Sequence, residues 1–174
     1  SVTGGFRATR LSTVPGPSEV CRAGYINHAN EGKIATLGGA AEAIAEHGAV
    51  SGSVAQAMAE GALEKSGATY ALATTGIAGP GGGSAAKPVG TAYLALAGGG
   101  ETLVRHLFFP TDRETFTQLA AQNALNLLRV RLASDCREHS RLPECCVYSR
   151  LNAPIGSDLK TAASTVDASL CEAR

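Results

Sequence analysis

Apolar residues recur at intervals of three and four positions in two segments of the chain, a spacing that is typical of amphipathic helices. The first segment, SVAQAMAEGALEKSGA, begins with Ser53 and Gln56 at the spacing of a capping box, and it is predicted to end at Gly67. The second begins with a similar pair, Thr111 and Glu114, and has the longer periodic face. That face consists of Phe116, Leu119, Ala120, Asn123, Ala124, Leu127 and Leu128.

Three further apolar runs are short and predict β-strands. They are TYALATT, VGTAYLALAG and ETLVRHLFFP, and the glycines between the last two predict an antiparallel hairpin with a short turn. Near the start of the chain, SVTGGFRATRL predicts a turn that leads into a helix, and SEVCRAGYIN predicts a short strand. Helices and strands therefore alternate along the chain up to about Leu132.

The periodic pattern ends at Leu132. The remaining segment contains prolines and scattered charges, so we expect one domain over residues 1–132 and an irregular, disordered tail over residues 133–174. A zinc site in the tail is the weaker alternative, because the spacing of its candidate ligands matches no paired Cys-x-x-Cys site, and we expect no metal. Those candidates are Cys136, His139, Cys145 and Cys146.

The composition narrows the classes of partner. The 174 residues include 15 basic and 15 acidic side chains, so no net charge attracts nucleic acid or an anionic membrane, and we expect neither as a partner. No apolar run approaches the ~20 residues of a membrane span, and no charged-then-apolar leader opens the sequence, so we expect a cytoplasmic protein. The five cysteines are odd in number and unevenly spaced, which favours free thiols.

The segment TTGIAGPGGG follows the first predicted strand and is rich in glycine. Glycine lets main-chain N–H groups approach a phosphate closely, because it has no Cβ and accepts positive φ. The segment is neither a Walker loop nor a Rossmann fingerprint, since a strand follows it where those motifs have a helix. We expect a ligand cradle between strands, with Thr74, Thr75 and Lys87 as further contacts. The alternative is a simple turn, above all at Gly82 and Gly83.

Several motifs together resemble one known family. They are SVTGG, NEGK, HGAVSGSVAQAMAEGA, TGIAGPGGG followed by KPVGTAYLALA, and FPTDRETF, in this order from Ser1 to about Leu132. The chain is similar to the CinA C-terminal domain family, the nicotinamide-nucleotide amidohydrolases. The resemblance implies a three-layer α/β/α domain with a mixed sheet, in which the first strand of the family is missing here. It also implies hydrolysis of the carboxamide of nicotinamide mononucleotide to nicotinate mononucleotide and ammonia, without a cofactor.

The resemblance also assigns catalytic roles to particular residues. The family motif Ser-Cys-Thr-Gly-Gly falls on SVTGG, so its nucleophile falls on Ser1, while Val2 replaces the motif cysteine. The family lysine, which acts as base, falls on Lys33 of NEGK. A neutral lysine amine can take the proton of an attacking serine, but this requires a pKa below ~10.4. His28 stands where the family commonly has a tyrosine, and its imidazole is expected to substitute for that group in proton transfer.

The remaining site residues are expected to bind the substrate. Main-chain N–H groups around Thr3, Gly4 and Gly5 are candidates for stabilising an oxyanion. We expect Arg113, in the first turn of the second amphipathic helix, to bind the 5′-phosphate, and a plain surface role is the alternative. The cradle residues expected to contact the phosphate or the ribose are Thr75, Gly76, Gly79 and Gly81.

Two other interpretations remain open. The first is an N-terminal nucleophile hydrolase, in which the α-amine of Ser1 is the base. The second is a nucleotide-binding module of the same family with impaired catalysis, because the Gly-rich loop is intact while Val2 and His28 depart from the family pattern. The partner in either case is a small molecule, and association into a homo-oligomer is also expected from the resemblance.

Overall fold

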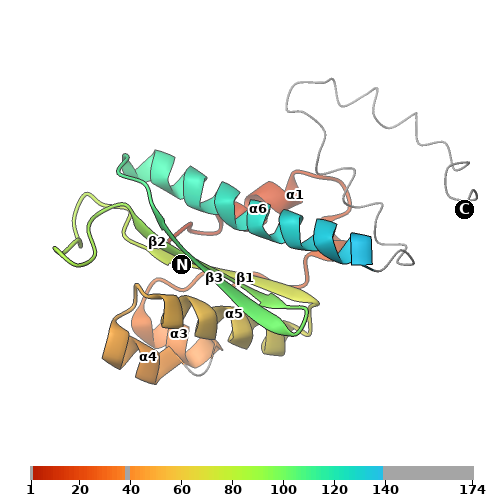
Figure 1. Ribbon diagram of the computed structural model, residues 1–174, viewed down its shortest axis with the longest axis horizontal. Helices are drawn as coiled ribbons and strands as arrows, with labels where there is room; N and C mark the ends of the chain where they lie inside the picture. Colours follow the sequence, from red (N-terminus) through yellow and green to blue (C-terminus); the bar gives the residue numbers. More distant parts are fainter. Residues whose placement is uncertain (1, 38–39, 139–174) are drawn as a thin grey trace, which may run out of the picture. The chain divides into compact units, whose positions relative to one another are not determined.

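The computed structural model describes residues 2–37 and 40–138. The chain divides into two compact units, Ser1–Arg131 and Leu132–Arg174, and the sheet and all site residues discussed below belong to the first. Figure 1 shows the elements along the chain. In order they are α1 (Phe6–Ser12), α2 (Pro17–Val20), α3 (Asn30–Leu37), α4 (Ala40–His47), α5 (Gly52–Ser66), β1 (Tyr70–Gly76), β2 (Thr91–Gly98), β3 (Glu101–Phe108) and α6 (Arg113–Glu138).

The three strands form one sheet in the order β1-β2-β3. Tyr70 pairs with Gly98 at one end of the first pair of strands, and Gly98 pairs with Glu101 in the second. Gly99 and Gly100 form the turn of the predicted hairpin at φ values of 65° and 84°. The resemblance implied a mixed sheet, whereas the described sheet is antiparallel throughout, because both of its connections join consecutive strands directly.

Helices cover both faces of this sheet, which gives three layers of α/β/α type (Figure 1). Side chains of β2 alternate between the two faces. Ala95 and Ala97 pack against one face of α5, whereas Ala92 packs against Phe116 on α6. The α/β class and the layered architecture expected from the sequence are therefore confirmed. The largest side chain that is fully buried is Phe116.

The predicted helix over the SVAQAMAEGALEKSGA segment is confirmed as α5. It ends where expected, at Gly67 with φ of 60°, a conformation that glycine adopts without strain. The predicted N-cap at Ser53 is wrong. The cap is Ser51, whose backbone is extended and whose hydroxyl accepts a hydrogen bond from the Val54 N–H at 3.3 Å.

The second amphipathic helix is confirmed as α6, and its N-cap also differs from the prediction. Oδ1 of Asp112, in place of the expected Thr111 hydroxyl, accepts from the N–H groups of Glu114 and Thr115 at 3.0 Å each. The helix continues to Glu138, so residues 133–138 are helical where an irregular tail was expected. The rest of that tail, with His139, Cys145 and Cys146, lies outside the described residues.

The predicted strand in SEVCRAGYIN is wrong. Its first part is the short helix α2, which Pro17 begins after Gly16 has turned the chain at φ of 86°. Residues 21–28 then run without helix or strand, since they pair with none of the three strands. Strand β1 consequently forms one edge of the described sheet. The helices α3 and α4, which the sequence interpretation did not predict, follow this segment.

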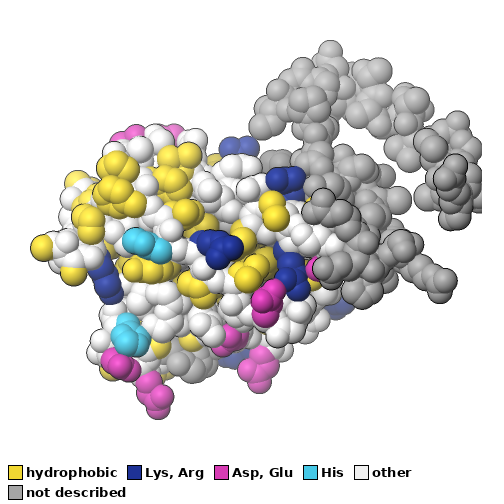
Figure 2. Space-filling model, viewed as in Figure 1, with side chains coloured by type: hydrophobic (Ala, Val, Ile, Leu, Met, Phe, Trp, Pro, Cys, Tyr) yellow, Lys and Arg dark blue, Asp and Glu magenta, His cyan; other side chains and the backbone are white. Residues whose placement is uncertain are grey.

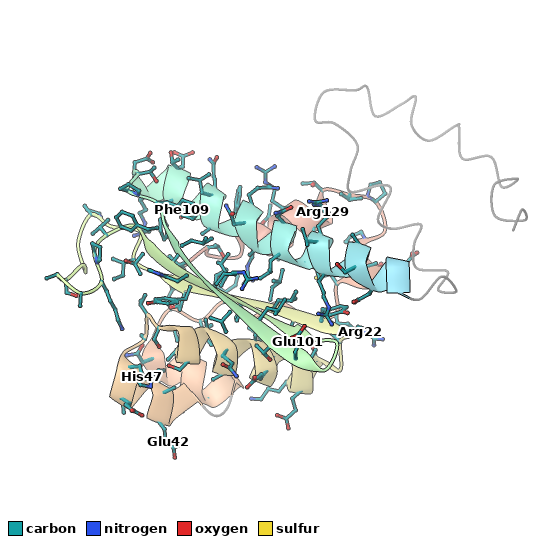
Figure 3. The ribbon with its side chains drawn as sticks, viewed as in Figure 1. Arg22, Glu42, His47, Glu101, Phe109 and Arg129 are labelled. Atoms are coloured by element: carbon teal, nitrogen blue, oxygen red, sulfur yellow. The ribbon has the colours of Figure 1, made fainter. Side chains whose placement is uncertain are left out.

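Figure 2 shows hydrophobic side chains gathered on the visible face near the beginning of α6 and the ends of the strands. Phe108, the last residue of β3, is half exposed. The next residue, Phe109, lies beside the first turns of α6 (Figure 3) and makes an edge-to-face contact with Phe116 at 6.3 Å. Among the described helices, none has the length and apolar content that crossing a bilayer requires.

Candidate active site

The loop before α1 contacts the end of strand β1. Ser1, the expected nucleophile, lies outside the described residues, so the structure gives no distance from its hydroxyl. Thr3 is buried, and its Oγ1 lies 3.5 Å from Oγ1 of Thr74 on β1. The carbonyl oxygen of Thr3 accepts from the Phe6 N–H at 2.9 Å. Residues 71 positions apart in the sequence thus meet beside the SVTGG loop.

Gly4 and Gly5 both have positive φ, of 54° and 90°, which explains the two glycines of this loop. The surroundings of the two residues differ. A Cβ at Gly5 would lie 2.7 Å from Cδ1 of Ile26, whereas a Cβ at Gly4 would meet no atom within 4 Å. Because Ile26 is exposed and the end of its side chain can move, the positive φ is the main requirement for glycine at position 5, and the surroundings of Gly4 are open.

Lys33 lies in the first half of α3 and is buried, with 4% of its surface exposed. Its Nζ donates to the main-chain oxygen of His28 at 2.9 Å and to Oδ1 of Asn30 at 3.3 Å. Burial lowers the pKa of Lys33 below its usual value, and the nearby carboxylate of Glu31 offsets part of this effect. The environment thus favours the neutral amine more than water does.

His28 is joined to Lys33 through its main chain. His28 is exposed, and its carbonyl oxygen accepts the hydrogen bond from Nζ of Lys33. The sequence interpretation missed Asn30, whose amide oxygen is the second acceptor. The signal was present in NEGK, because residues three apart at the beginning of a helix lie on the same side of it.

The Gly-rich segment connects β1 to β2, as the sequence predicts. Thr75 is almost fully buried, at 1% exposure, and its hydroxyl donates to the carbonyl of Ala49 at 2.8 Å. Since a hydroxyl has one proton, Thr75 is left with acceptor capacity only. Lys87 extends away from the loop and donates from Nζ to the His47 carbonyl, at the end of α4, at 2.6 Å. His47 is labelled in Figure 3.

The glycines of the cradle differ in how far their surroundings require a residue without a side chain. A Cβ at Gly76 would lie 2.7 Å from the Thr91 oxygen, and one at Gly79, where φ is 77°, would lie 2.6 Å from Val89. Both are therefore required by the packing of the chain itself. Gly81 is exposed, has no positive φ, and a Cβ there would meet no atom within 4 Å. Neither the backbone conformation nor the packing of the described residues therefore requires glycine at position 81.

Arg113, at the first position of α6, reaches the Gly-rich loop. Its Nη1 donates to the carbonyl oxygen of Gly79 at 2.8 Å, which connects two predicted site residues 34 positions apart. A guanidinium has five N–H donors, so this bond leaves others for a ligand. The sequence interpretation did not predict Asp112, the residue before Arg113, which caps the same helix. Its pKa is lowered by hydrogen bonds from Thr115 and Glu114.

The predicted residues are thus joined in three pairs, Thr3 with Thr74, Lys33 with His28, and Arg113 with Gly79. A cavity of about 190 Å³ lies beside the first pair and is lined by Thr3 and Gly5, but by neither Lys33 nor the glycine loop. Within residues 2–37 and 40–138, no three side chains of His, Cys, Asp or Glu gather as metal ligands would.

Comparison with known proteins identifies relatives of the chain. The profile of the CinA C-terminal domain matches residues 1–132. A CinA-like protein of Akkermansia muciniphila is 48% identical over 126 residues, which is 72% of this chain and 30% of the relative. A CinA-like protein of an Anaeromyxobacter species is 49% identical over 132 residues, which is 76% of this chain and 32% of the relative. The chain thus spans less than a third of the length of these curated relatives.

Solved structures agree with this assignment. The crystal structure of the competence/damage inducible protein CihA from Agrobacterium tumefaciens superposes with a TM-score of 0.71 at 40% identity, and the match covers 74% of this chain and 79% of that one. The sequence match, the common fold and the order of the SVTGG, NEGK and TGIAGPGGG motifs all point the same way. The chain belongs to the CinA C-terminal domain family.

Proposed function

We propose that this chain hydrolyses the carboxamide of nicotinamide mononucleotide through a serine ester, with Ser1 as nucleophile and Lys33 as base. The observation that carries the proposal is the state of Lys33. A buried amine with a lowered pKa is suited to accept the proton of a serine hydroxyl, which an ordinary surface lysine is not. The choice of substrate and of Ser1 as nucleophile rests on the resemblance of the SVTGG and NEGK motifs to the nicotinamide-nucleotide amidohydrolases.

The contacts of Lys33 suit this role. A neutral amine has two protons and one lone pair, and the two acceptors of Nζ, on His28 and Asn30, account for two donated protons. The lone pair is then left for the proton of the nucleophile. In this scheme Ser1 attacks the carboxamide carbon while Lys33 takes the hydroxyl proton. Lys33 passes that proton to the departing ammonia, and water then cleaves the ester with Lys33 again as base.

The proposed substrate contacts come from the loop before α1, from the connection between β1 and β2, and from the first residue of α6. Main-chain N–H groups of the Thr3 to Gly5 loop would stabilise the oxyanion. The open main chain at Gly81 and the remaining donors of Arg113 would bind the 5′-phosphate. His28 contributes its carbonyl to the position of Lys33.

The test measures ammonia release from nicotinamide mononucleotide by the unaltered chain and by Ser1→Ala, and it measures binding of the nucleotide separately. The proposal predicts turnover by the parent and, for the variant, binding near the parent level without turnover. Equal turnover by Ser1→Ala would exclude the serine mechanism. Binding without turnover by the parent would select the other candidate, a nucleotide-binding module, which the departures at Val2 and His28 favour.

A further inference from the structure

The outer edge of strand β3 carries main-chain groups that no described strand pairs with. Within the described residues, β3 has β2 as its single strand neighbour. In Figure 1 the strand runs across the front of the sheet, with α6 above it and α5 below it. Its pairing with β2 is continuous from Glu101 to Phe108, so no bulge interrupts this edge, and the strand contains neither proline nor lysine. Those are common devices that protect an edge strand from further pairing.

The register of the hairpin shows which main-chain groups of β3 face the free edge. Glu101 closes the two-residue turn, so it forms a hydrogen-bonded pair with β2, and every second residue after it does the same. The Phe109 N–H, on the same alternation, donates to the Gly90 oxygen at 2.8 Å. The N–H and C=O groups of Thr102 and Val104 consequently point outward, away from β2.

The side chains along this edge carry one charge of each sign on one face. Leu107 packs with Phe116 of α6, so the face that α6 covers also bears Glu101, Leu103 and Arg105. Glu101 and Arg105 are exposed, and Leu103 between them is half-buried. Two opposite charges therefore stand at equal distances along the strand on either side of an apolar residue.

Both charges have capacity for a further partner. Nη1 of Arg105 donates to the neighbouring carbonyl of Val104 at 3.4 Å, and the arginine forms no ion pair within residues 2–37 and 40–138. Glu101, which is labelled in Figure 3, binds Arg131 of α6 through Oε1, and its second oxygen can accept from another guanidinium. A charged side chain on an edge strand discourages pairing in any register that leaves it unmatched.

We propose that two copies of this chain associate by antiparallel pairing of their β3 strands about a two-fold axis at Leu103. Leu103 then faces its counterpart, and Glu101 lies opposite Arg105 on both sides of the axis. Thr102 of each copy exchanges N–H···O bonds with Val104 of the other. The charged and apolar positions form the non-hydrogen-bonded pairs, whose side chains lie closer together.

The charges select this register among the possible ones. Outward-facing residues must pair with outward-facing residues, so the axis has to pass through a residue of the strand. An axis at Arg105 would place like charges opposite each other. An axis at Thr102, Val104 or His106 would place both charges opposite uncharged side chains. The axis at Leu103 is the one that matches opposite charges.

A second copy fits the edge better than an unrelated peptide. An acidic peptide strand would match Arg105 but would leave Glu101 without a new partner, whereas a second copy matches both charges and the central leucine. None of the candidate site residues lies on β3, so this inference does not depend on the proposed amidase activity. It names the surface and the register of an association that the sequence left open.

The test is sedimentation equilibrium of the full chain from micromolar to millimolar concentration. We expect the parent to be in equilibrium between monomer and dimer. Arg105→Glu places like charges opposite each other twice, so the dissociation constant of the dimer should rise about tenfold or more. Glu101→Arg should have the same effect. The double variant with both changes should bring the constant back toward the parent value, because opposite charges meet again.

A control and a second measurement keep the test decisive. Lys65→Glu makes the same change of charge on an exposed residue of α5 and should dimerise as the parent does. In the unaltered chain, the amides of Thr102 and Val104 should exchange hydrogen more slowly as the dimer forms, a result that needs no variant to fold. The proposal is overturned if the parent stays monomeric at millimolar concentration, or if those two amides gain no protection on association. It is also overturned if Arg105→Glu dimerises as Lys65→Glu does, or if the double variant is no tighter than either single one.

Discussion

Nζ of Lys33 donates a hydrogen bond to the main-chain oxygen of His28, five residues earlier, at 2.9 Å. The acceptor belongs to the main chain, so the contact requires no particular side chain at position 28. Asn30 adds a side-chain acceptor at 3.3 Å. Burial of this group lowers its pKa, and that has a measurable consequence for stability.

Replacement of Lys33 by methionine tests the lowered pKa directly. The unfolded chain holds the lysine proton up to the ordinary pKa of about 10.4, and the folded chain releases it at lower pH. Between those two pH values the unfolded state binds more protons, so the free energy of unfolding of the parent rises with pH relative to Lys33→Met. Urea unfolding at pH 7 and pH 10 measures this difference.

The control for that experiment is Lys65→Met, which removes an exposed lysine from α5. Its difference from the parent should change much less between the two pH values. If the difference between the parent and Lys33→Met is the same at pH 7 and pH 10, the pKa of Lys33 is not lowered in the folded protein.

Replacement by alanine should destabilise the protein at Gly76 but not at Gly81. Gly76→Ala places a Cβ 2.7 Å from a main-chain oxygen and 3.1 Å from Cζ of Phe116, so we expect a loss of about 1–3 kcal/mol in the free energy of unfolding. Gly81→Ala meets nothing within 4 Å and should be as stable as the parent. Thermal unfolding checks both, and equal stability of the two variants would contradict the packing described here.

The larger variant Gly81→Val tests the ligand role of the same loop. If the main chain at Gly81 contacts the phosphate, the branched side chain should reduce the preference of the protein for nicotinamide mononucleotide over its dephosphorylated riboside. Affinities for the two compounds, measured on folded protein, decide this. A variant that discriminates as well as the parent would make the loop a turn only.

Arg113→Ala should weaken binding of the nucleotide more than binding of the riboside. The variant removes a guanidinium that is joined to Gly79, and loss of a charge-assisted hydrogen bond to the phosphate would reduce affinity by about tenfold or more. Arg105→Ala on the exposed side of β3 is the matched control and should bind as the parent does. Equal losses for both ligands would assign Arg113 to loop structure alone.

The helix cap is tested by two serines of the same segment. Ser51→Ala should cost about 1 kcal/mol, because its hydroxyl accepts from the Val54 N–H, and this lowers Tm by about 2–4 °C for a chain of this length. Ser53→Ala should cost less, since Ser53 is not the cap. A larger loss of stability for Ser53→Ala than for Ser51→Ala would instead support Ser53 as the cap, as expected from the sequence.

The sequence predicted the elements whose cause is local. The periodic faces of α5 and α6, the Gly67 terminus and the Gly99–Gly100 turn all follow from spacing and from glycine at fixed places. The caps were each misplaced by one or two residues, because neighbouring Ser, Thr and Asp residues compete for the same role. The choice between them depends on which backbone is extended before the helix, and this is not visible in residue type.

The strand expected within SEVCRAGYIN, residues 18–27, does not form, and the reason is not local. A strand needs a hydrogen-bonded neighbour, and none of the described strands pairs with this segment. The candidate site likewise combines features that the sequence identified with features that only the folded chain shows. The family resemblance identified Lys33 as a candidate, whereas the acceptor role of Asn30 and the contact between Arg113 and Gly79 required the folded chain.

The most direct test of Lys33 as the base is the pH dependence of ammonia release from nicotinamide mononucleotide by the parent and by Lys33→Arg. Protonation of the amine removes its lone pair, so the rate of the parent should fall on the acidic side of a pKa below the ordinary value for lysine. Arginine stays protonated at any workable pH, so Lys33→Arg should be slower by about 10²-fold or more at every pH. A parent rate without an acidic limb, or a Lys33→Arg variant as fast as the parent, would contradict the mechanism.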